Sequence, residues 1–253
     1  LKSQEKKLDN KELTELPDVE ESIHFSFEEV ELPKYKKIIS FSTKELKVQD
    51  KILSKNIELD VVGNPHICII GQNGVGKSTL IKEIYNALKT RTDIKVGYMP
   101  QNYEDILSCY DKVIDFIAPT GKKEDMTKAR MYLGNMNFTR EEMEGSITEL
   151  SNGTKAKLIL MKLVLDKCNV LLLDEPLTSL YIVVQEEMKQ VLKNMKKDHI
   201  LIFSTHILEL ALDLCDEIVI LNNKKLELVE KSNLNMKKYK NKIIDCLKEE
   251  ENV

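Results

Sequence analysis

The sequence lacks a long hydrophobic run, a secretory leader and closely spaced cysteines. None of its apolar stretches approaches the roughly 20 residues that a membrane-spanning helix needs, and no secretory pattern is present. The 5 cysteines stand far apart, without the spacing of a metal site. Cys68, Cys168 and Cys215 fall in or beside apolar segments, which is typical of small buried thiols in a reducing compartment. We therefore expect a cytoplasmic domain.

Neither sign of charge dominates the chain. The formal net charge is −4 and 32% of the residues are charged, so no overall field favours nucleic acid and we expect no direct DNA binding. Residues 1–31 hold 10 acidic side chains and 4 lysines, which predicts a charged linker or extension over 1–32. Residues 224–242 carry 7 lysines against 2 acids, and this favours a solvated face over an RNA-contacting tail in residues 226–253. Residues 33–225 remain as one domain, long enough to bury a full core.

Residues 71–78, Gly-Gln-Asn-Gly-Val-Gly-Lys-Ser, match the P-loop pattern G-x-x-x-x-G-K-[ST]. Residues 66–70 before them predict a buried strand, and apolar residues after them recur at helical spacing. In that context backbone N–H groups and the positive end of the helix dipole face an anion. Lys77 can reach the β- and γ-phosphates and Ser78 can bind Mg²⁺, whereas a chance glycine-rich turn would not have this context. The candidate nucleotide-binding residues are Gly71, Gln72, Asn73, Gly74, Val75, Gly76, Lys77, Ser78 and Thr79.

A second motif combines an apolar strand with two carboxylates. Val170-Leu171-Leu172-Leu173 is typical of a strand buried on both faces of a parallel sheet, and Asp174 and Glu175 follow it directly. Alone, such a strand is ordinary architecture, but together with a P-loop it indicates a Walker B motif. Asp174 is then predicted to hold Mg²⁺, and Glu175 to orient or deprotonate the attacking water.

Three more segments lie between and after these two motifs, and their order along the chain is informative. Residues 149–155, Glu-Leu-Ser-Asn-Gly-Thr-Lys, begin a predicted helix with Ser151 as its N-cap. Gln101 follows Tyr98-Met99-Pro100, and His206 follows a further apolar strand. With these segments the chain, over roughly residues 40–222, resembles the ABC ATPases. The resemblance implies an α/β fold with a P-loop (RecA-like) core, an antiparallel β-subdomain and an inserted α-helical subdomain at about residues 102–165.

The same resemblance assigns roles to particular residues. It implies an ATPase that uses ATP and Mg²⁺, with Gln101 and His206 catalytic beside Glu175 and with Gln101 also at the metal. It implies a signature segment that contacts the nucleotide of a second ABC domain, formed by Ser151, Asn152, Gly153 and Thr154. The partner is thus another copy of this chain or a missing tandem domain.

The branch of the family stays open between two alternatives. Gln101 follows Gly71 by only 30 residues (101 − 71 = 30), and this interval and the insert at 113–134 look like the ABC-F proteins. Those work on the ribosome, include antibiotic-resistance factors, and have a helical linker to which residues 1–32 could correspond. Residues 177–181 and 204–221 look more like the ATPase subunit of an ABC exporter, which has a membrane partner. We favour a ribosome-associated switch driven by ATP.

Two departures from the family pattern predict slow turnover. Asn152 stands where the signature normally has glycine, and Tyr181 stands where the D-loop has aspartate. A degenerate nucleotide-binding module without turnover is therefore a third alternative. The place of the adenine-stacking aromatic holds Lys47-Val48-Gln49, so base selectivity is expected to be weak.

Local patterns add two structural expectations. Residues 38–62 alternate like a pair of antiparallel strands with a turn at Asp50-Lys51. Thr139-Arg140-Glu141-Glu142 matches a capping box at the start of a helix.

Overall fold

The structure, a computed structural model, describes residues 37–178, 180–195, 199–222 and 225–230 of the 253-residue chain. The predicted linker at 1–32 and most of the predicted lysine-rich tail lie outside the described residues. No helix in the described ranges is both long enough and apolar enough to cross a bilayer.

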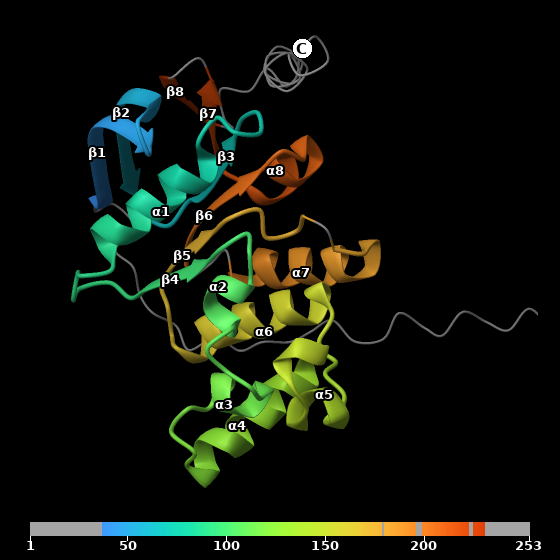
Figure 1. Ribbon diagram of the computed structural model, residues 1–253. Helices are drawn as coiled ribbons and strands as arrows, with labels where there is room; N and C mark the ends of the chain where they lie inside the picture. Colours follow the sequence, from blue (N-terminus) through green and yellow to red (C-terminus); the bar gives the residue numbers. More distant parts are fainter. Residues whose placement is uncertain (1–36, 179, 196–198, 223–224, 231–253) are drawn as a thin grey trace, which may run out of the picture.

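A six-stranded sheet in the order β4-β5-β6-β3-β7-β8 forms the centre of the molecule (Figure 1). The first five strands in that order run parallel, and β8 pairs antiparallel with β7 at the edge. Every residue of β3, β5 and β6 is buried, which confirms the prediction of strands covered on both faces. The strand bounds are β3 His66–Ile70, β4 Val96–Met99, β5 Val170–Leu173, β6 Ile200–Thr205, β7 Glu217–Asn222 and β8 Lys225–Glu230.

The two faces of the sheet belong to two separate clusters of buried side chains. One cluster joins the sheet to α1, Lys77–Leu88, and to a hairpin of β1, Lys37–Val48, and β2, Lys51–Val62. The other joins the opposite face to α6, Asn152–Leu165, and to two helices that follow β5 and β6. These are α7, Ile182–Met195, and α8, Leu208–Leu214. The apolar residues of each strand alternate between the two clusters, and together the clusters hold the strand ends in place.

The hairpin confirms the antiparallel prediction with one correction. Its turn consists of Gln49 and Asp50, and not Asp50 and Lys51, because Lys51 already pairs with Val48 in the sheet. Gln49 takes the left-handed backbone conformation that this tight connection needs (φ 52°).

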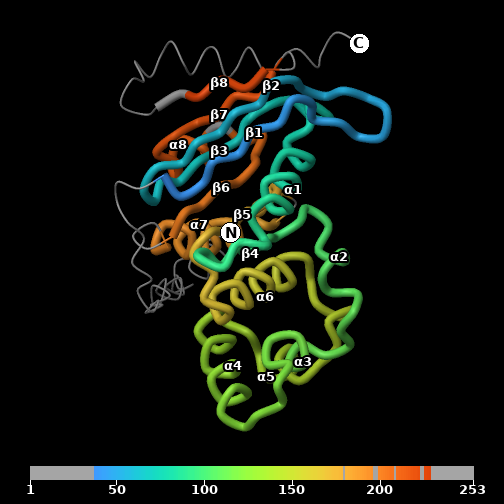
Figure 2. The backbone as a smooth tube through the Cα atoms, turned by 90° about the vertical axis from the view of Figure 1, so that its left-hand side faces the viewer, coloured from blue at the N-terminus to red at the C-terminus, as the bar shows by residue number. Residues whose placement is uncertain are grey.

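The segment predicted as an inserted helical subdomain consists of several helices joined by turns and short extended stretches. The helices of this segment lead from β4 to the end of the molecule away from the hairpin, where they lie beside α6 (Figures 1 and 2). They are α2 Glu104–Leu107, α3 Val113–Ile117, α4 Lys123–Asn135, α5 Arg140–Glu144 and a 3₁₀ turn at Ile147–Glu149. The fold is thus the α/β architecture that the resemblance implied, with an antiparallel β-subdomain and a helical insert.

The described sheet continues past the boundary that we predicted after residue 225. Residues Leu226, Glu227 and Leu228 lie inside β8, and Leu226 packs against the hairpin-side cluster. The lysines nearby made this segment look like the start of a polar tail, but its period-2 alternation lets it pair with β7. Cys68, Cys168 and Cys215 are buried thiols, as predicted.

The capping box at α5 gives a test of local stability. The Thr139 hydroxyl accepts the N–H of Glu142 at 3.2 Å, and the Thr139 N–H donates to Glu142 Oε2 at 2.8 Å. We expect Thr139→Ala to lower the free energy of unfolding by about 1 kcal/mol in urea denaturation. Thr127→Ala is the matched control, because its hydroxyl only bonds back to Lys123 within α4. Equal losses in both variants would show that the cap contributes nothing specific.

Candidate functional site

The P-loop connects the end of β3 to the start of α1. Gly74 (φ 75°) and Gly76 (φ 110°) both adopt left-handed backbone conformations that side chains disfavour. At Gly71 a Cβ would lie 2.5 Å from the carbonyl oxygen of Leu221 in β7, so the loop passes too close to the sheet for any other residue. The glycines therefore shape the turn, and α1 begins with its N-terminus at the loop.

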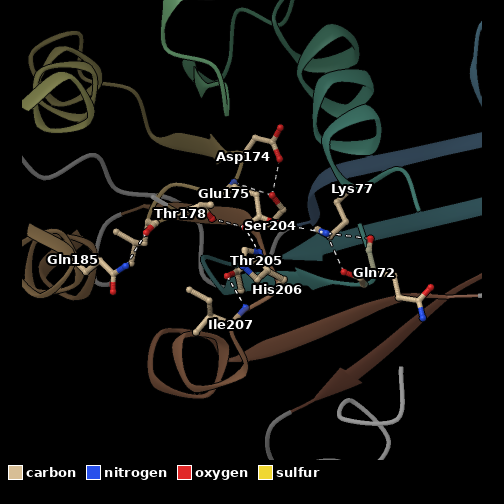
Figure 3. A network of polar contacts seen from close by, with 12 residues as sticks. Gln72, Lys77, Asp174, Glu175, Thr178, Gln185, Ser204, Thr205, His206 and Ile207 are labelled. Carbon is tan, nitrogen blue, oxygen red and sulfur yellow. Dashed lines mark hydrogen bonds and ion pairs between the residues drawn. The ribbon is translucent and has the colours of Figure 1, made fainter. Parts of the chain in front are cut away.

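Lys77 is a buried cation at this helix start, with 6% of its side chain exposed. Its Nζ donates to the carbonyl oxygens of Gly71 at 2.9 Å and of Gln72 at 3.2 Å. It also lies 3.5 Å from Glu175 Oε1 (Figure 3). A buried ammonium is costly without partners, and these three oxygen groups compensate its loss of water.

Glu175 lies at the centre of the polar network that Figure 3 draws. Its side chain is 5% exposed, and its Oε2 accepts a hydrogen bond from Thr178 Oγ1 at 2.8 Å and faces His206 Nδ1 at 3.0 Å. With Lys77 at the other oxygen, the carboxylate contacts three side chains from three segments. Its backbone is in the left-handed region (φ 50°), which is unusual for a residue that is not glycine.

Asp174 precedes Glu175 and faces the helix side of the site. Its N–H donates to the Met99 carbonyl at 2.8 Å, and its Oδ1 accepts from Ser204 Oγ at 2.6 Å. Burial raises the pKa of the Asp174 carboxyl, and hydrogen bonds from the Ser204 and Ser78 hydroxyls partly oppose that rise. Burial, helped by the nearby Asp174 carboxyl, also raises the pKa of Tyr98 to about 12.

The side chains predicted to hold Mg²⁺ lie together. Ser78, Asp174 and Gln101 line the same hollow, and the Ser78 hydroxyl is near enough to lower the pKa of the Asp174 carboxyl. Carboxylate, hydroxyl and amide oxygens are hard donors, so their chemistry fits Mg²⁺.

An open cavity of about 570 Å³ lies between the P-loop and the hairpin tip. Lys77, Gln101 and Glu175 are among the residues that line it, and the hairpin contributes Val48, Gln49, Lys51 and Leu53. The cavity thus joins the candidate phosphate-binding groups to a hairpin lining that contains no aromatic side chain.

The signature residues lie apart from this cavity. Ser151 caps α6 by accepting the Thr154 N–H at 3.1 Å, as predicted. Asn152 begins α6 and shares a second hollow with Gln101 and Glu175, but none of the four signature residues lines the P-loop cavity. Among the described residues, the left-handed conformations do not include Asn152, so its substitution for glycine adds bulk without backbone strain.

Sequence reasoning missed Thr178, Ser204 and Leu53. Thr178 follows the Walker B carboxylates closely enough to be suspected, but a hydroxyl in a loop is a weak signal. Ser204 carried a better signal, because it is one of two hydroxyl residues that end a strand whose first four residues are apolar. Leu53 contacts the site only through the pairing of the hairpin.

Comparison with known proteins agrees with this geometry. Residues 54–178 match the family model described as ABC transporter. The chain is 29% identical over 185 residues to "Probable ATP-binding protein YheS" of Escherichia coli (strain K12), covering 70% of this chain and 29% of that protein. It is 27% identical over 199 residues to "Zinc import ATP-binding protein ZnuC" of Rickettsia bellii, covering 74% of this chain and 84% of that protein.

A solved structure shows the same fold. The dimeric post-hydrolysis state of an ATP-binding cassette bound to ADP and Pi aligns with a TM-score of 0.62 at 16% identity, covering 77% of this chain and 97% of that chain. The chain spans less than a third of the length of the YheS relatives that it matches. Together with the motifs, these matches identify an ATPase domain of the ABC type in this chain.

The position of Lys77 predicts its effect on nucleotide affinity. We expect Lys77→Ala to weaken ATP binding on the order of 10- to 100-fold, because a charge-assisted contact to phosphate contributes roughly 1.5–3 kcal/mol. Isothermal titration calorimetry measures this loss. Lys89→Ala is the control, since that lysine contacts only Asn86 and Tyr85 near the far end of α1. Unchanged affinity in Lys77→Ala would remove the P-loop assignment.

The lack of an aromatic residue in the hairpin lining of the cavity leads to a second expectation. An aromatic ring that stacks on a base contributes about 1–3 kcal/mol, so Val48→Tyr should tighten ATP binding by about fivefold or more. Val62→Tyr is the matched control on the same hairpin, because Val62 is also exposed but does not line the cavity. If both variants bind ATP like the parent, the base does not lie against Val48.

Proposed function

We propose that this ABC-type ATPase domain is a switch that ATP closes and hydrolysis opens, and that its partner is the ribosome. The single observation that carries the catalytic part is the contact between Lys77 and Glu175. A lysine placed for phosphate and a carboxylate placed to be a general base lie 3.5 Å apart at one edge of the sheet.

The proposed hydrolysis uses a bound Mg²⁺ ion. Ser78, Asp174 and Gln101 would hold the ion, which when bound neutralises charge on the β- and γ-phosphates. Gly71, Gln72, Asn73, Gly74, Val75, Gly76 and Thr79 would surround the phosphates together with Lys77 and Ser78.

Lys77 links nucleotide binding to the state of the base. In the structure its ammonium contacts one carboxylate oxygen of Glu175, while Thr178 and His206 contact the other. Phosphate oxygens would compete for the same ammonium and so release Glu175 Oε1 to accept a proton from water. Thr178 and His206 would keep the carboxylate oriented through Oε2.

A second ABC domain would complete the site. Tyr181, Ile182 and Val183 expose 82%, 83% and 71% of their surfaces just after the Walker B segment. Contiguous exposed apolar side chains of this size mark an interaction surface, and the ATP-binding cassette with the similar fold is dimeric. In such an assembly Ser151, Asn152, Gly153 and Thr154 would face the nucleotide of the other copy or of a tandem domain.

The ribosome is favoured by the short connection between the P-loop and Gln101. Residues 89–95 lead from α1 to β4 without an additional strand, and the insert holds the helices α3 and α4 that resembled ABC-F proteins. This assignment places the protein in the cytoplasm. The alternative, an energy subunit of an exporter or another membrane complex, is favoured by the match to ZnuC along 84% of that protein.

Glu175→Gln separates binding from hydrolysis. The amide keeps the shape of the side chain but cannot accept a proton, so we expect ATP binding to persist and single-turnover hydrolysis to fall on the order of 100-fold or more. Glu209→Gln on α8 is the matched control, because Glu209 is exposed and outside the network. Normal single-turnover hydrolysis by Glu175→Gln would rule out Glu175 as the base.

The same variant tests the partner. With ATP present, Glu175→Gln should stay closed and co-sediment with ribosomes, whereas Lys77→Ala should not. Affinity purification that recovers a membrane protein with several spans, and no ribosomal subunits, would replace the ribosome by the membrane alternative.

The departures at Asn152 and Tyr181 predict slow hydrolysis with ATP binding intact. Asn152 adds side-chain bulk where a partner's phosphate would approach, and Tyr181 replaces a small acid at a close interface. Asn152→Gly with Tyr181→Asp should therefore raise the steady-state rate more than the affinity for ATP. A double variant with the parent rate would show that both substitutions are neutral for turnover.

A further inference from the structure

We propose that Ser204 is a positioning residue that fixes both carboxylates of the site, Asp174 and Glu175, through one hydroxyl group. The inference rests on the proposed hydrolysis of ATP at this site, and it concerns a residue that no motif identified. Ser204 acts through its two neighbours and is not itself placed against the nucleotide.

The strand order places Ser204 between the two motifs. Its strand, β6, lies between β5, which ends at the carboxylates, and β3, which ends at the P-loop. Leu173 of β5 pairs with Phe203 of β6, so the residues that follow them, Asp174 and Ser204, are next in register. On the other side of β6, Ser204 pairs with Ile69 of β3. The side chain of Ser204 is completely buried.

One hydroxyl serves both carboxylate residues in fixed directions. Ser204 Oγ donates its single proton to Asp174 Oδ1 at 2.6 Å and accepts the backbone N–H of Glu175 at 2.9 Å (Figure 3). A serine hydroxyl has only one proton, and the N–H needs a lone pair, so the two bonds cannot exchange roles. Each bond therefore restricts the geometry of the other.

The second bond holds an unusual backbone. Glu175 has φ 50°, a conformation that costs on the order of 1–3 kcal/mol and persists only where the surroundings impose it. A buried N–H also needs an acceptor, and Ser204 supplies one. Without that acceptor the peptide of Glu175 is free to rotate toward an ordinary conformation.

Rotation of this peptide would move the base. From its present backbone position the Glu175 carboxylate contacts Thr178, His206 and Lys77. Because the same hydroxyl is bonded to Asp174, a shift of the candidate metal ligand is transmitted to the base through Ser204. Loss of the hydroxyl should therefore disturb hydrolysis far more than nucleotide binding.

Ser204→Ala tests this role with three measurements on the purified chain. Hydrogen exchange of the Glu175 amide should become about tenfold faster or more, because its acceptor is removed. The affinity for a non-hydrolysable ATP analogue should stay within about threefold of the parent, while the single-turnover rate falls roughly 10- to 100-fold. Ser204→Thr, which keeps the hydroxyl, should restore the rate.

Ser54→Ala is the matched control. Ser54 is also completely buried in a strand, but its hydroxyl has no hydrogen-bond partner among the described residues. The same substitution there should change neither the exchange of the Glu175 amide nor the rate. If Ser204→Ala does not fold, Ser204→Cys, which has a similar volume and a weak donor, takes its place in all three measurements.

Two results would overturn the proposal. One is a Ser204→Ala variant, or its Ser204→Cys substitute, with the exchange and the rate of the parent. The other is a parallel loss of affinity and rate in that variant, which indicates a purely structural residue. Failure of the parent to hydrolyse ATP would instead contradict the proposed function. The exchange of the Glu175 amide would then decide alone whether Ser204 holds this peptide.

Discussion

The site depends on one buried ion pair, between the ammonium of Lys77 and the carboxylate of Glu175. Two charges that are both almost fully removed from water are costly unless geometry and further hydrogen bonds compensate them. Here the carbonyls of Gly71 and Gln72 serve the lysine, and Thr178 and His206 serve the glutamate. The order of the strands makes the pair possible, because β6 separates the strands that end at the two charges and presents Ser204 between them.

In the proposed mechanism Lys77 has two partners that exclude each other, the carboxylate of Glu175 and the phosphates of ATP. While the ammonium contacts Glu175, one oxygen of the base is occupied, and a triphosphate offers a stronger competing set of oxygens. A ligand changes a conformational equilibrium only through its different affinity for the two states, and exchange of the lysine between carboxylate and phosphate is such a difference. The exposed apolar segment at Tyr181 and the signature residues on α6 both lie outside the P-loop cavity. In the proposed assembly these two segments contact a second domain, so the state of the nucleotide would also affect that contact.

The sequence was sufficient wherever the signal was local. The strand–loop–helix of the P-loop, the buried strand before Asp174 and the capping box at Thr139 follow from short patterns, and the structure has each of them. The errors came from pairing between segments. Lys51 belongs to a strand because it pairs with Val48, and β8 is a strand because it pairs with β7. The contacts of Ser204 could not be predicted for the same reason, since they require the order and register of strands far apart in the chain.

The exchange of Lys77 between two partners is tested most directly by a crystal structure of this chain with Mg²⁺ and a non-hydrolysable ATP analogue. We expect Lys77 Nζ to contact the β- and γ-phosphates and to move out of ion-pair range of Glu175, beyond roughly 4 Å. The bonds of Ser204 to Asp174 and Glu175 should be retained. A structure with the analogue bound at the P-loop and the contact between Lys77 and Glu175 unchanged would contradict the proposed link between nucleotide binding and release of the base.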